Sequence, residues 1–173
     1  RSKHQLSFED AKRTVDYFFN PQRNQSPRLT VSIFGGGEPL LSWNKVVYPI
    51  IEYIYKQAKE YSKEVVTTLI TNGSLIPDDF VDICRRYSID LVCSFEILED
   101  VQNSQRRHFE VVSSNIRTMI DNGVVPAINS VITDLNVARQ CEMIEVLKSC
   151  YPEIKYVAFE PVISPLSEDK DTF

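Results

Sequence analysis

The sequence predicts an α/β fold in which parallel strands and helices alternate to form part of a (β/α) barrel of the TIM type. Strand-like and helix-like patterns alternate five times without interruption, which is typical of parallel strands joined by right-handed helical crossovers. The strand-like runs are apolar at successive positions, as in strands that are buried on both faces. A flavodoxin-like open sheet fits the same two observations, so the pattern alone leaves both arrangements open.

The expected strands are rich in β-branched and aromatic residues and stop at glycine or polar residues. They span residues 29–34, 65–70, 89–95, 124–133 and 156–159. The expected helices repeat apolar residues about one turn apart. They span residues 7–19, 42–61, 109–122 and 136–150, with a further helix that opens at Pro77.

Local signals support the ends and the faces of these helices. Ser7, with the acid Asp10 three residues further on, is a suitable N-cap, and Gly123 suits the C-terminal end of helix 109–122. The residues expected to face inward are Ala11, Val15, Phe18 and Phe19 in the first helix, and Val137, Cys141, Ile144 and Leu147 in the last. The polar stretch 96–107 is too long for a simple turn, so we expect a functional loop there.

Composition and charge indicate which classes of binding partner are excluded for this protein. The net charge is −5 and the isoelectric point is near 5.1, which argues against a nucleic acid or an anionic membrane as the main partner. No apolar run approaches the roughly 18 residues that span a bilayer, and the first residues do not resemble a signal peptide. These features predict a cytoplasmic protein that binds neither nucleic acid nor membrane.

The four cysteines are spread singly along the chain and form no CxxC pair, so no local metal site can be read from them. They are Cys84, Cys93, Cys141 and Cys150. Reduced and mostly buried thiols of a cytosolic protein are the expected state. Cys93 lies inside an apolar strand and is expected to belong to the core.

Polar residues gather where the expected strands end, and in both candidate folds this is the edge at which ligands bind. They are residues 35–39, residues 71–73, Ser94, Glu96, Asn129, Ser130, Thr133 and Glu160. Three glycines after a strand let the backbone approach a ligand closely, and Glu38 behind them can accept hydrogen bonds from an ammonium group. A plain tight turn with an exposed acid is the alternative. The loop has neither the Gly-Lys-Ser/Thr of a P-loop nor the spacing of a dinucleotide site.

Several residues at these strand ends resemble the motifs of a known enzyme family. Gly36-Gly37-Glu38-Pro39 resembles the GGEP motif of radical S-adenosylmethionine (SAM) enzymes, and Thr71-Asn72-Gly73-Ser74-Leu75-Ile76 is similar to the family's TNG(T/S)LL. Ser94 and Arg106 keep the spacing of a further family pattern, and residues 109–133 resemble the family's next helix and strand. The resemblance covers roughly residues 7–163, and sulfatase-maturing and peptide-modifying members are the most similar in style.

The resemblance implies a SAM site. The glycine-rich loop would hold the amino group of the methionine moiety, and Ser94 and Arg106 would contact its carboxylate. The cofactor-binding residues implied in this way are Gly36, Gly37, Glu38, Pro39, Asn72, Ser94 and Arg106. No catalytic residue and no metal ligand within this chain is implied.

Two departures qualify the resemblance. Glu96-Ile97 stands where many members have Asp-Gly, so the conformation of that loop is open. The CxxxCxxC motif that ligates the family's [4Fe–4S] cluster is absent from this sequence, and in the family it lies upstream of the first helix. We therefore expect residues 1–173 to be a single, truncated core domain with about five βα units, lacking the first strand and the last unit. As given, the chain is expected to be inactive.

The leading hypothesis is thus the core of a radical SAM enzyme that modifies a peptide or protein and receives electrons from a donor. The alternative is a degenerate barrel without a cluster that binds a peptide or a nucleoside, which the Glu96-Ile97 pair favours slightly. A third reading is an ordinary α/β binding domain with a chance GGEP. The missing first strand would leave strand 29–34 with an unpaired edge, through which the chain is expected to self-associate.

Several other residues have two readings. His4 and His108 are expected to be solvated or packed in loops, and Trp43 is expected to anchor its helix in the core rather than to line a pocket. Glu160 either faces the substrate or is a solvated acid at the rim. One of Asn129 and Ser130 points into the barrel, and the sequence does not distinguish them.

Overall fold

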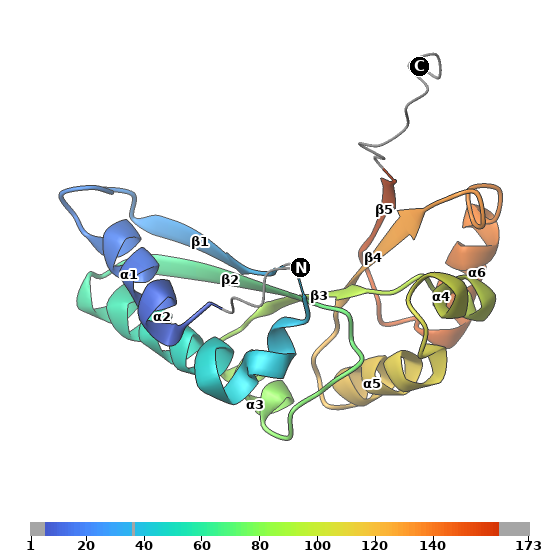
Figure 1. Cartoon of the computed structure of the whole chain (residues 1–173), viewed down its shortest axis with the longest axis horizontal. Helices are drawn as coiled ribbons and strands as arrows, with labels where there is room; N and C mark the ends of the chain where they lie inside the picture. The colour runs from blue at the N-terminus through green and yellow to red at the C-terminus, as the bar shows by residue number, and fades with distance from the viewer. Residues whose placement is uncertain (1–5, 36, 163–173) are drawn as a thin grey trace, which may run out of the picture.

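The computed structural model describes residues 6–35 and 37–162, and within them it forms a curled half-barrel (Figure 1). The five parallel strands are β1 (Arg28–Ile33), β2 (Glu64–Thr71), β3 (Asp90–Ser94), β4 (Ala127–Ile132) and β5 (Val157–Pro161). They are hydrogen-bonded in the order β1-β2-β3-β4-β5, the same as their order in the sequence. A flavodoxin-like sheet would reverse direction at a switch point. The sequential order therefore decides for the partial barrel.

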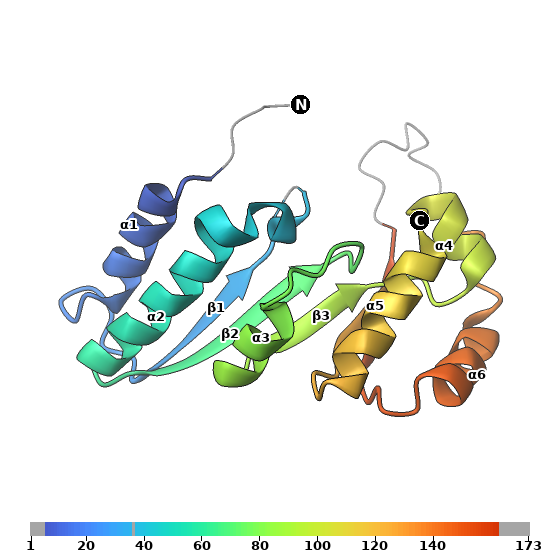
Figure 2. The same ribbon diagram turned by 90° about the horizontal axis from the view of Figure 1, so that it is seen from below.

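Every helix that the sequence predicts is present, and all of them cover the convex side of the sheet (Figures 1 and 2). The α-helices are α1 (Phe8–Phe19), α2 (Tyr48–Glu60), α3 (Phe80–Arg86), α4 (Glu99–Gln105), α5 (Phe109–Asp121) and α6 (Gln140–Cys150). A 3₁₀ turn (Pro39–Ser42) and a π turn (Trp43–Val47) lead into α2. The short helix α4 lies inside the stretch expected to be a loop.

Side chains along the strands alternate between the convex face, which the helices cover, and the more open concave face, as the pleat requires. On β2, Thr67, Leu69 and Thr71 are buried, whereas Thr68 and Ile70 between them are only partly buried. Strand β1 alternates between exposed and half-buried residues throughout. The expectation of strands buried on both faces is therefore wrong for the described residues, because helices cover only one face of this sheet.

The core lies between the strands and the helices, and Trp43 anchors it beside the glycine-rich loop. Its side chain is buried, its ring lies edge-on to Phe80 with centroids 5.3 Å apart, and its indole N–H donates to Asp79 Oδ1 at 2.7 Å. The expectation of a core role for Trp43 is confirmed. Ser7 caps α1 as predicted, because its side-chain oxygen accepts from the backbone N–H of Asp10 at 3.1 Å.

The expected inward faces need correction at both ends of the chain. Phe18 is 53% exposed and Val137 is 54% exposed, and Cys141 is exposed as well. Helix α6 begins at Gln140 rather than near Asn136, and Met143 rather than Cys141 lies in the core. Asn136 instead closes a turn, since its side chain accepts from the N–H of Thr133 and donates to the carbonyl of Val131.

The four cysteines divide into two pairs with different chemistry. All four are free thiols; Cys84 and Cys93 are buried, whereas Cys141 and Cys150 are exposed on α6, so the expectation of mostly buried thiols holds for only half of them. Burial raises the pKa of Cys84 and of Cys93 to about 12, which keeps both protonated at neutral pH. We expect a maleimide to label two thiols rapidly in the native protein and four in denaturant, as counted by mass spectrometry. Rapid native labelling of Cys93 would contradict this packing.

Strand β1 lies at the end of the sheet, and its outer edge has no partner strand within residues 6–35 and 37–162. An open edge exposes main-chain donors and acceptors that can pair with another chain. We therefore expect light scattering to give a mass above the monomer at high protein concentration, and Thr30→Lys, which places a charge on that strand, to restore the monomer. A monomeric mass for the unsubstituted chain at every concentration would refute self-association through this edge.

Candidate functional site at the C-terminal rim of the half-barrel

The residues predicted to bind a ligand lie along the edge of the sheet where β1, β2 and β3 end. Gly37, Glu38 and Pro39 follow β1, Asn72 follows β2, and Ser94 is the last residue of β3. Arg106 is the residue after α4. Gly36, the remaining predicted residue, lies outside the described residues.

Glu38 fastens the glycine-rich loop to the end of β2. Its Oε1 accepts from the N–H of Leu40 at 3.0 Å and from Thr71 Oγ1 at 2.8 Å, and its Oε2 accepts from the N–H of Asn72 at 2.7 Å. A carboxylate has about four lone-pair positions, so three chain donors leave room for about one more. Pro39 follows at the start of the 3₁₀ turn that Glu38 caps. The sequence predicted a free acceptor here, and the structure adds a bracing role.

Residues 71–73 form a rigid turn next to that carboxylate. Asn72 Oδ1 accepts from the N–H of Ser74 at 2.9 Å, and Thr71 Oγ1 accepts from the N–H of Gly73 at 3.1 Å. Gly73 has a φ of +71°, which a residue without a side chain adopts readily, and its carbonyl accepts from Asn115 Nδ2 at 2.8 Å. The acceptor of the Asn72 side chain is thus used by its own turn.

Ser94 and Asn129 lie side by side on the concave face. They are Cα partners in the register of β3 and β4, whereas Ser130 points to the opposite face, where it is buried. Asn129 is therefore the residue that points into the barrel. Its Oδ1 is shielded from solvent and has no hydrogen-bond partner among the described residues. A shielded acceptor without a donor is rare in folded proteins, which singles out this position on the concave face.

Arg106 is held at the rim by Glu96, an acid that the sequence placed at this edge but not among the cofactor-binding residues. Arg106 Nε donates to Glu96 Oε1 at 2.5 Å; the side chain of Glu96 is 0% exposed and that of Arg106 is 32% exposed. Glu96 Oε2 accepts from Ser130 Oγ at 2.9 Å and from the N–H of Val131 at 2.8 Å. The two terminal nitrogens of Arg106 have no partner within residues 6–35 and 37–162, so they are free to bind an anion.

The two halves of the predicted site lie at the same edge of the sheet. Glu38 is bonded to the end of β2, and Arg106 is bonded through Glu96 to β4, two strands away. Neighbouring strands are about 4.8 Å apart, so these attachment points are separated by about 10 Å. Cys93 on the strand between them responds to both charges: burial raises the pKa of its thiol most, the negative charge of Glu38 raises it further, and Arg106 lowers it.

Other predicted residues lie away from this rim or carry no ligand chemistry. Cys93 is fully buried in the core, as predicted. His108 is exposed in a left-handed conformation just before α5, and His4 is outside the described residues. Glu160 is exposed on β5 and pairs in register with Val131, which places it on the concave face.

The described residues do not fit an iron–sulfur cluster. No group of three or more His, Cys, Asp or Glu side chains in them is close enough to hold a metal ion. Two of the four cysteines are buried in the core, and the other two lie on α6. No chemical step in this chain is therefore assigned to a cluster.

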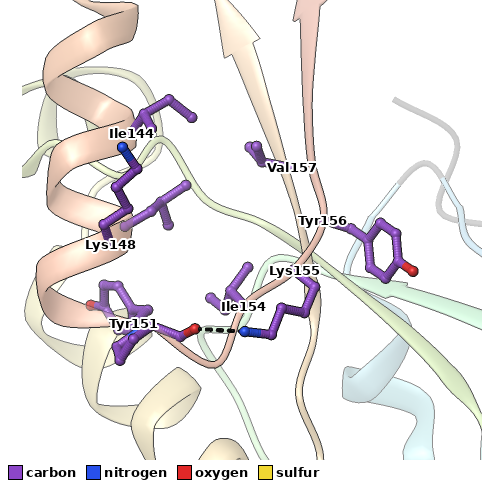
Figure 3. A pocket seen from close by; sticks show the side chains of 9 residues that line it. Ile144, Lys148, Tyr151, Ile154, Lys155, Tyr156 and Val157 are labelled. Atoms are coloured by element: carbon purple, nitrogen blue, oxygen red, sulfur yellow. Dashed lines mark hydrogen bonds between the residues drawn. The ribbon is translucent and has the colours of Figure 1, made fainter.

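One hollow adjoins the rim at Gly37, Glu38 and Pro39, and another lies away from it. One of about 610 Å³ lies beside the glycine-rich loop, between β1, α1 and the start of α2, and apolar side chains such as Phe34, Leu41 and Ile50 line it. The other, of about 280 Å³, lies at the opposite end of the sheet between α6 and the start of β5 (Figure 3). In that hollow Lys155 Nζ donates to the carbonyl of Pro152, and Tyr156 points away from the other lining residues. Within the described part of the chain, no helix is long and apolar enough to cross a membrane.

Comparison with solved structures shows that proteins of known structure share this fold. The chain is similar over its whole length to anSMEcpe with bound AdoMet (SAM), with a TM-score of 0.84 and 16% sequence identity, covering 47% of that chain. It is also similar to anSMEcpe with bound AdoMet and the Kp18Cys peptide, with a TM-score of 0.81 and 17% identity, covering all of this chain and 48% of that chain. Similarity to Streptococcus suis SuiB bound to the precursor peptide SuiA has a TM-score of 0.63 and 17% identity, covering 93% of this chain and 34% of that chain.

The chain shares the fold of anSMEcpe and SuiB. The expectation drawn from the GGEP-like loop is thereby confirmed at the level of the fold, and the chain spans less than half the length of these neighbours. No protein-family model and no curated protein matches the sequence.

Proposed function

We propose that this chain is the SAM-binding core of a radical SAM enzyme that modifies a peptide or protein. The observation that carries the proposal is the placement of Glu38 and Arg106 at one edge of the sheet. Glu38 is hydrogen-bonded to the end of β2, and Arg106 is attached to β4 through Glu96. The points at which the two side chains are attached to the sheet are about 10 Å apart. An amino-acid headgroup fits between the two side chains, with its ammonium group at the carboxylate and its carboxylate at the guanidinium.

The residues present fit the amino-acid part of SAM. The loop that contains Gly37, together with the remaining lone pair of Glu38, accepts from the ammonium group, and the free nitrogens of Arg106 with Ser94 donate to the carboxylate. Asn129, the register partner of Ser94, lies beside it on the concave face, and its shielded Oδ1 lacks a donor in the described structure. When bound and reduced, SAM supplies a 5′-deoxyadenosyl radical that removes a hydrogen atom from the substrate. The chain's own residues bind and orient the cofactor and move no proton.

Several parts of the full reaction are proposed to lie outside the residues described. The four cysteines do not form a cluster site, so we assign the [4Fe–4S] ligands, and the contact with an electron donor, to other segments of a longer protein. On this proposal residues 1–173 form one domain that is inactive by itself. The free thiols agree with a cytoplasmic location.

A peptide is the proposed substrate class. The solved structures of anSMEcpe with the Kp18Cys peptide and of SuiB with the precursor peptide SuiA share this fold. The concave face of this chain is open and carries Asn129 and the exposed Glu160 beside the proposed cofactor site. That arrangement gives an extended substrate access to a cofactor held at the rim.

The proposed SAM site predicts which part of the ligand the chain recognises. Titration calorimetry should show tighter binding of S-adenosylhomocysteine than of 5′-methylthioadenosine, which lacks the amino-acid part. Arg106→Gln should reduce that preference by about tenfold or more, because a charge-assisted hydrogen bond to the carboxylate is lost. Arg85→Gln, on the exposed side of α3, is the matched control and should leave the preference unchanged.

The alternative function is a barrel without a cluster that binds a nucleoside or a peptide, which the Glu96-Ile97 departure from the family pattern suggested at the level of the sequence. The same titration separates it from the SAM site. Equal binding of both nucleosides, unaffected by Arg106→Gln, would support a nucleoside module and overturn the proposed recognition of the amino-acid part.

A further inference from the structure

The segment between β3 and α5 is held together by several hydrogen bonds to one buried residue, Gln102. Gln102 is buried; its Oε1 accepts from the N–H of Glu96 at 2.9 Å and its Nε2 donates to the carbonyl of Arg107 at 3.1 Å. Its own carbonyl accepts from the N–H groups of Arg106 and Arg107, at 2.8 and 2.7 Å. One side chain thus joins the beginning of the segment to its end.

The carboxylate of Glu96 is not accessible to a ligand. Its side chain is 0% exposed, one oxygen is bound to Arg106, and the other accepts two hydrogen bonds from Ser130 and Val131. An aspartate, one methylene shorter, would reach less far from the end of β3 toward β4. A buried carboxylate that keeps its charge needs such a full set of partners.

The hydrogen bond between Arg106 and Glu96 determines which nitrogens of Arg106 remain available to a ligand. A guanidinium can bind a carboxylate side-on, through Nε and one terminal nitrogen, or end-on, through both terminal nitrogens. Because Nε donates to Glu96, the side-on approach is blocked. Only the two terminal nitrogens are left to meet an anion at the rim.

We infer that Glu96, supported by Gln102, is the positioning residue that restricts Arg106 to end-on recognition of a ligand carboxylate. The part of this inference that concerns a ligand rests on the proposed function, whereas the part that concerns Arg106 does not. The Glu96-Ile97 departure from the family pattern is, on this account, a rebuilt support for the same cationic side chain rather than a sign of lost binding.

The orientation of Arg106 is tested by NMR of the ¹⁵N-labelled chain without any ligand. The Nε–Hε resonance of Arg106, identified by its loss in Arg106→Lys, should exchange with water at least about tenfold more slowly than that of Arg85, because it is hydrogen-bonded to a buried carboxylate. Glu96→Gln should remove this protection. Ser130→Ala, which deletes a different hydrogen bond to the same carboxylate, should keep it. Equal exchange of Arg106 and Arg85 in the unsubstituted chain would overturn the inference even if Glu96→Gln and Ser130→Ala failed to fold.

The effect on ligand recognition is tested with S-adenosylhomocysteine and 5′-methylthioadenosine. Glu96→Gln and Gln102→Met should each lower the preference for S-adenosylhomocysteine by about tenfold, with little change in the affinity for 5′-methylthioadenosine. If a folded Glu96→Gln protein keeps its full preference for S-adenosylhomocysteine, Glu96 has no positioning role, and the proposed function is unaffected. No preference in the unsubstituted protein would instead remove the proposed function, while the exchange rates still decide the orientation of Arg106.

Discussion

Gly73→Ala is expected to lower the free energy of unfolding by about 2–5 kcal/mol, for two separable reasons. A left-handed backbone costs a residue with a Cβ atom about 1–2 kcal/mol, and Gly73 has a φ of +71°. The added Cβ would also lie 2.7 Å from Cys93 Sγ and 3.1 Å from Val112 Cγ1, and overpacking of this kind costs about 1–3 kcal/mol. Chemical denaturation monitored by circular dichroism measures the sum.

Gly123 provides a matched control for this prediction. Its φ is +82°, but a Cβ there would meet nothing within 4 Å, so Gly123→Ala isolates the backbone cost of about 1–2 kcal/mol. Adding Cys93→Ala to Gly73→Ala removes the closer of the two contacts, and the double variant should lose less than the sum of the single effects. Equal destabilisation by Gly73→Ala and Gly123→Ala would show that residues 71–73 are packed less tightly than the structure has them.

Ile97→Ala is expected to lower the free energy of unfolding by about 3 kcal/mol, because it removes a fully buried aliphatic side chain. Ile97 is also strained: its φ is +69°, and the N–H of Leu98 donates to the carbonyl of Glu96 at 2.7 Å across it. This is a γ-turn with a β-branched residue at its centre, a conformation that costs on the order of 1–3 kcal/mol. The gain from burying the side chain exceeds that cost.

The strain leads to an unusual order of stability among variants. Ile97→Gly removes one more carbon than Ile97→Ala but also relieves the positive φ, so the glycine variant should be the more stable of the two by about 1 kcal/mol. At Ala11 on the regular helix α1, the same comparison should run the other way, since Gly costs about 1 kcal/mol relative to Ala there. An alanine variant at position 97 that is more stable than the glycine variant would contradict the left-handed turn.

The sequence predicted the rim well because strand ends carry strong local signals. The glycines after β1, the Asn72-Gly73 turn after β2 and the periodicity of the helices each depend on a few neighbouring residues. The family resemblance added Ser94 and Arg106, and the structure places both near the end of β3.

The sequence could not predict features that depend on contacts between distant segments. The helix α4 is short and mostly polar, and it is held by bonds such as that of Gln105 to Thr133 rather than by an apolar face of its own. The burial of Glu96 depends on Ser130 and Val131, more than thirty residues away along the chain. The register of β3 with β4 likewise decided that Asn129, rather than Ser130, faces the concave side. A lone acid just past a strand end, with an arginine ten residues on, was the available signal for the Glu96–Arg106 pair.

Titration of the ¹⁵N-labelled chain with SAM, followed by NMR chemical shifts, tests whether the rim binds this cofactor. The largest changes should occur together at Gly37, Asn72, Ser94 and the Nε–Hε group of Arg106. Changes confined to the hollow between α6 and β5, or no change at the rim when SAM is in large excess, would contradict this prediction.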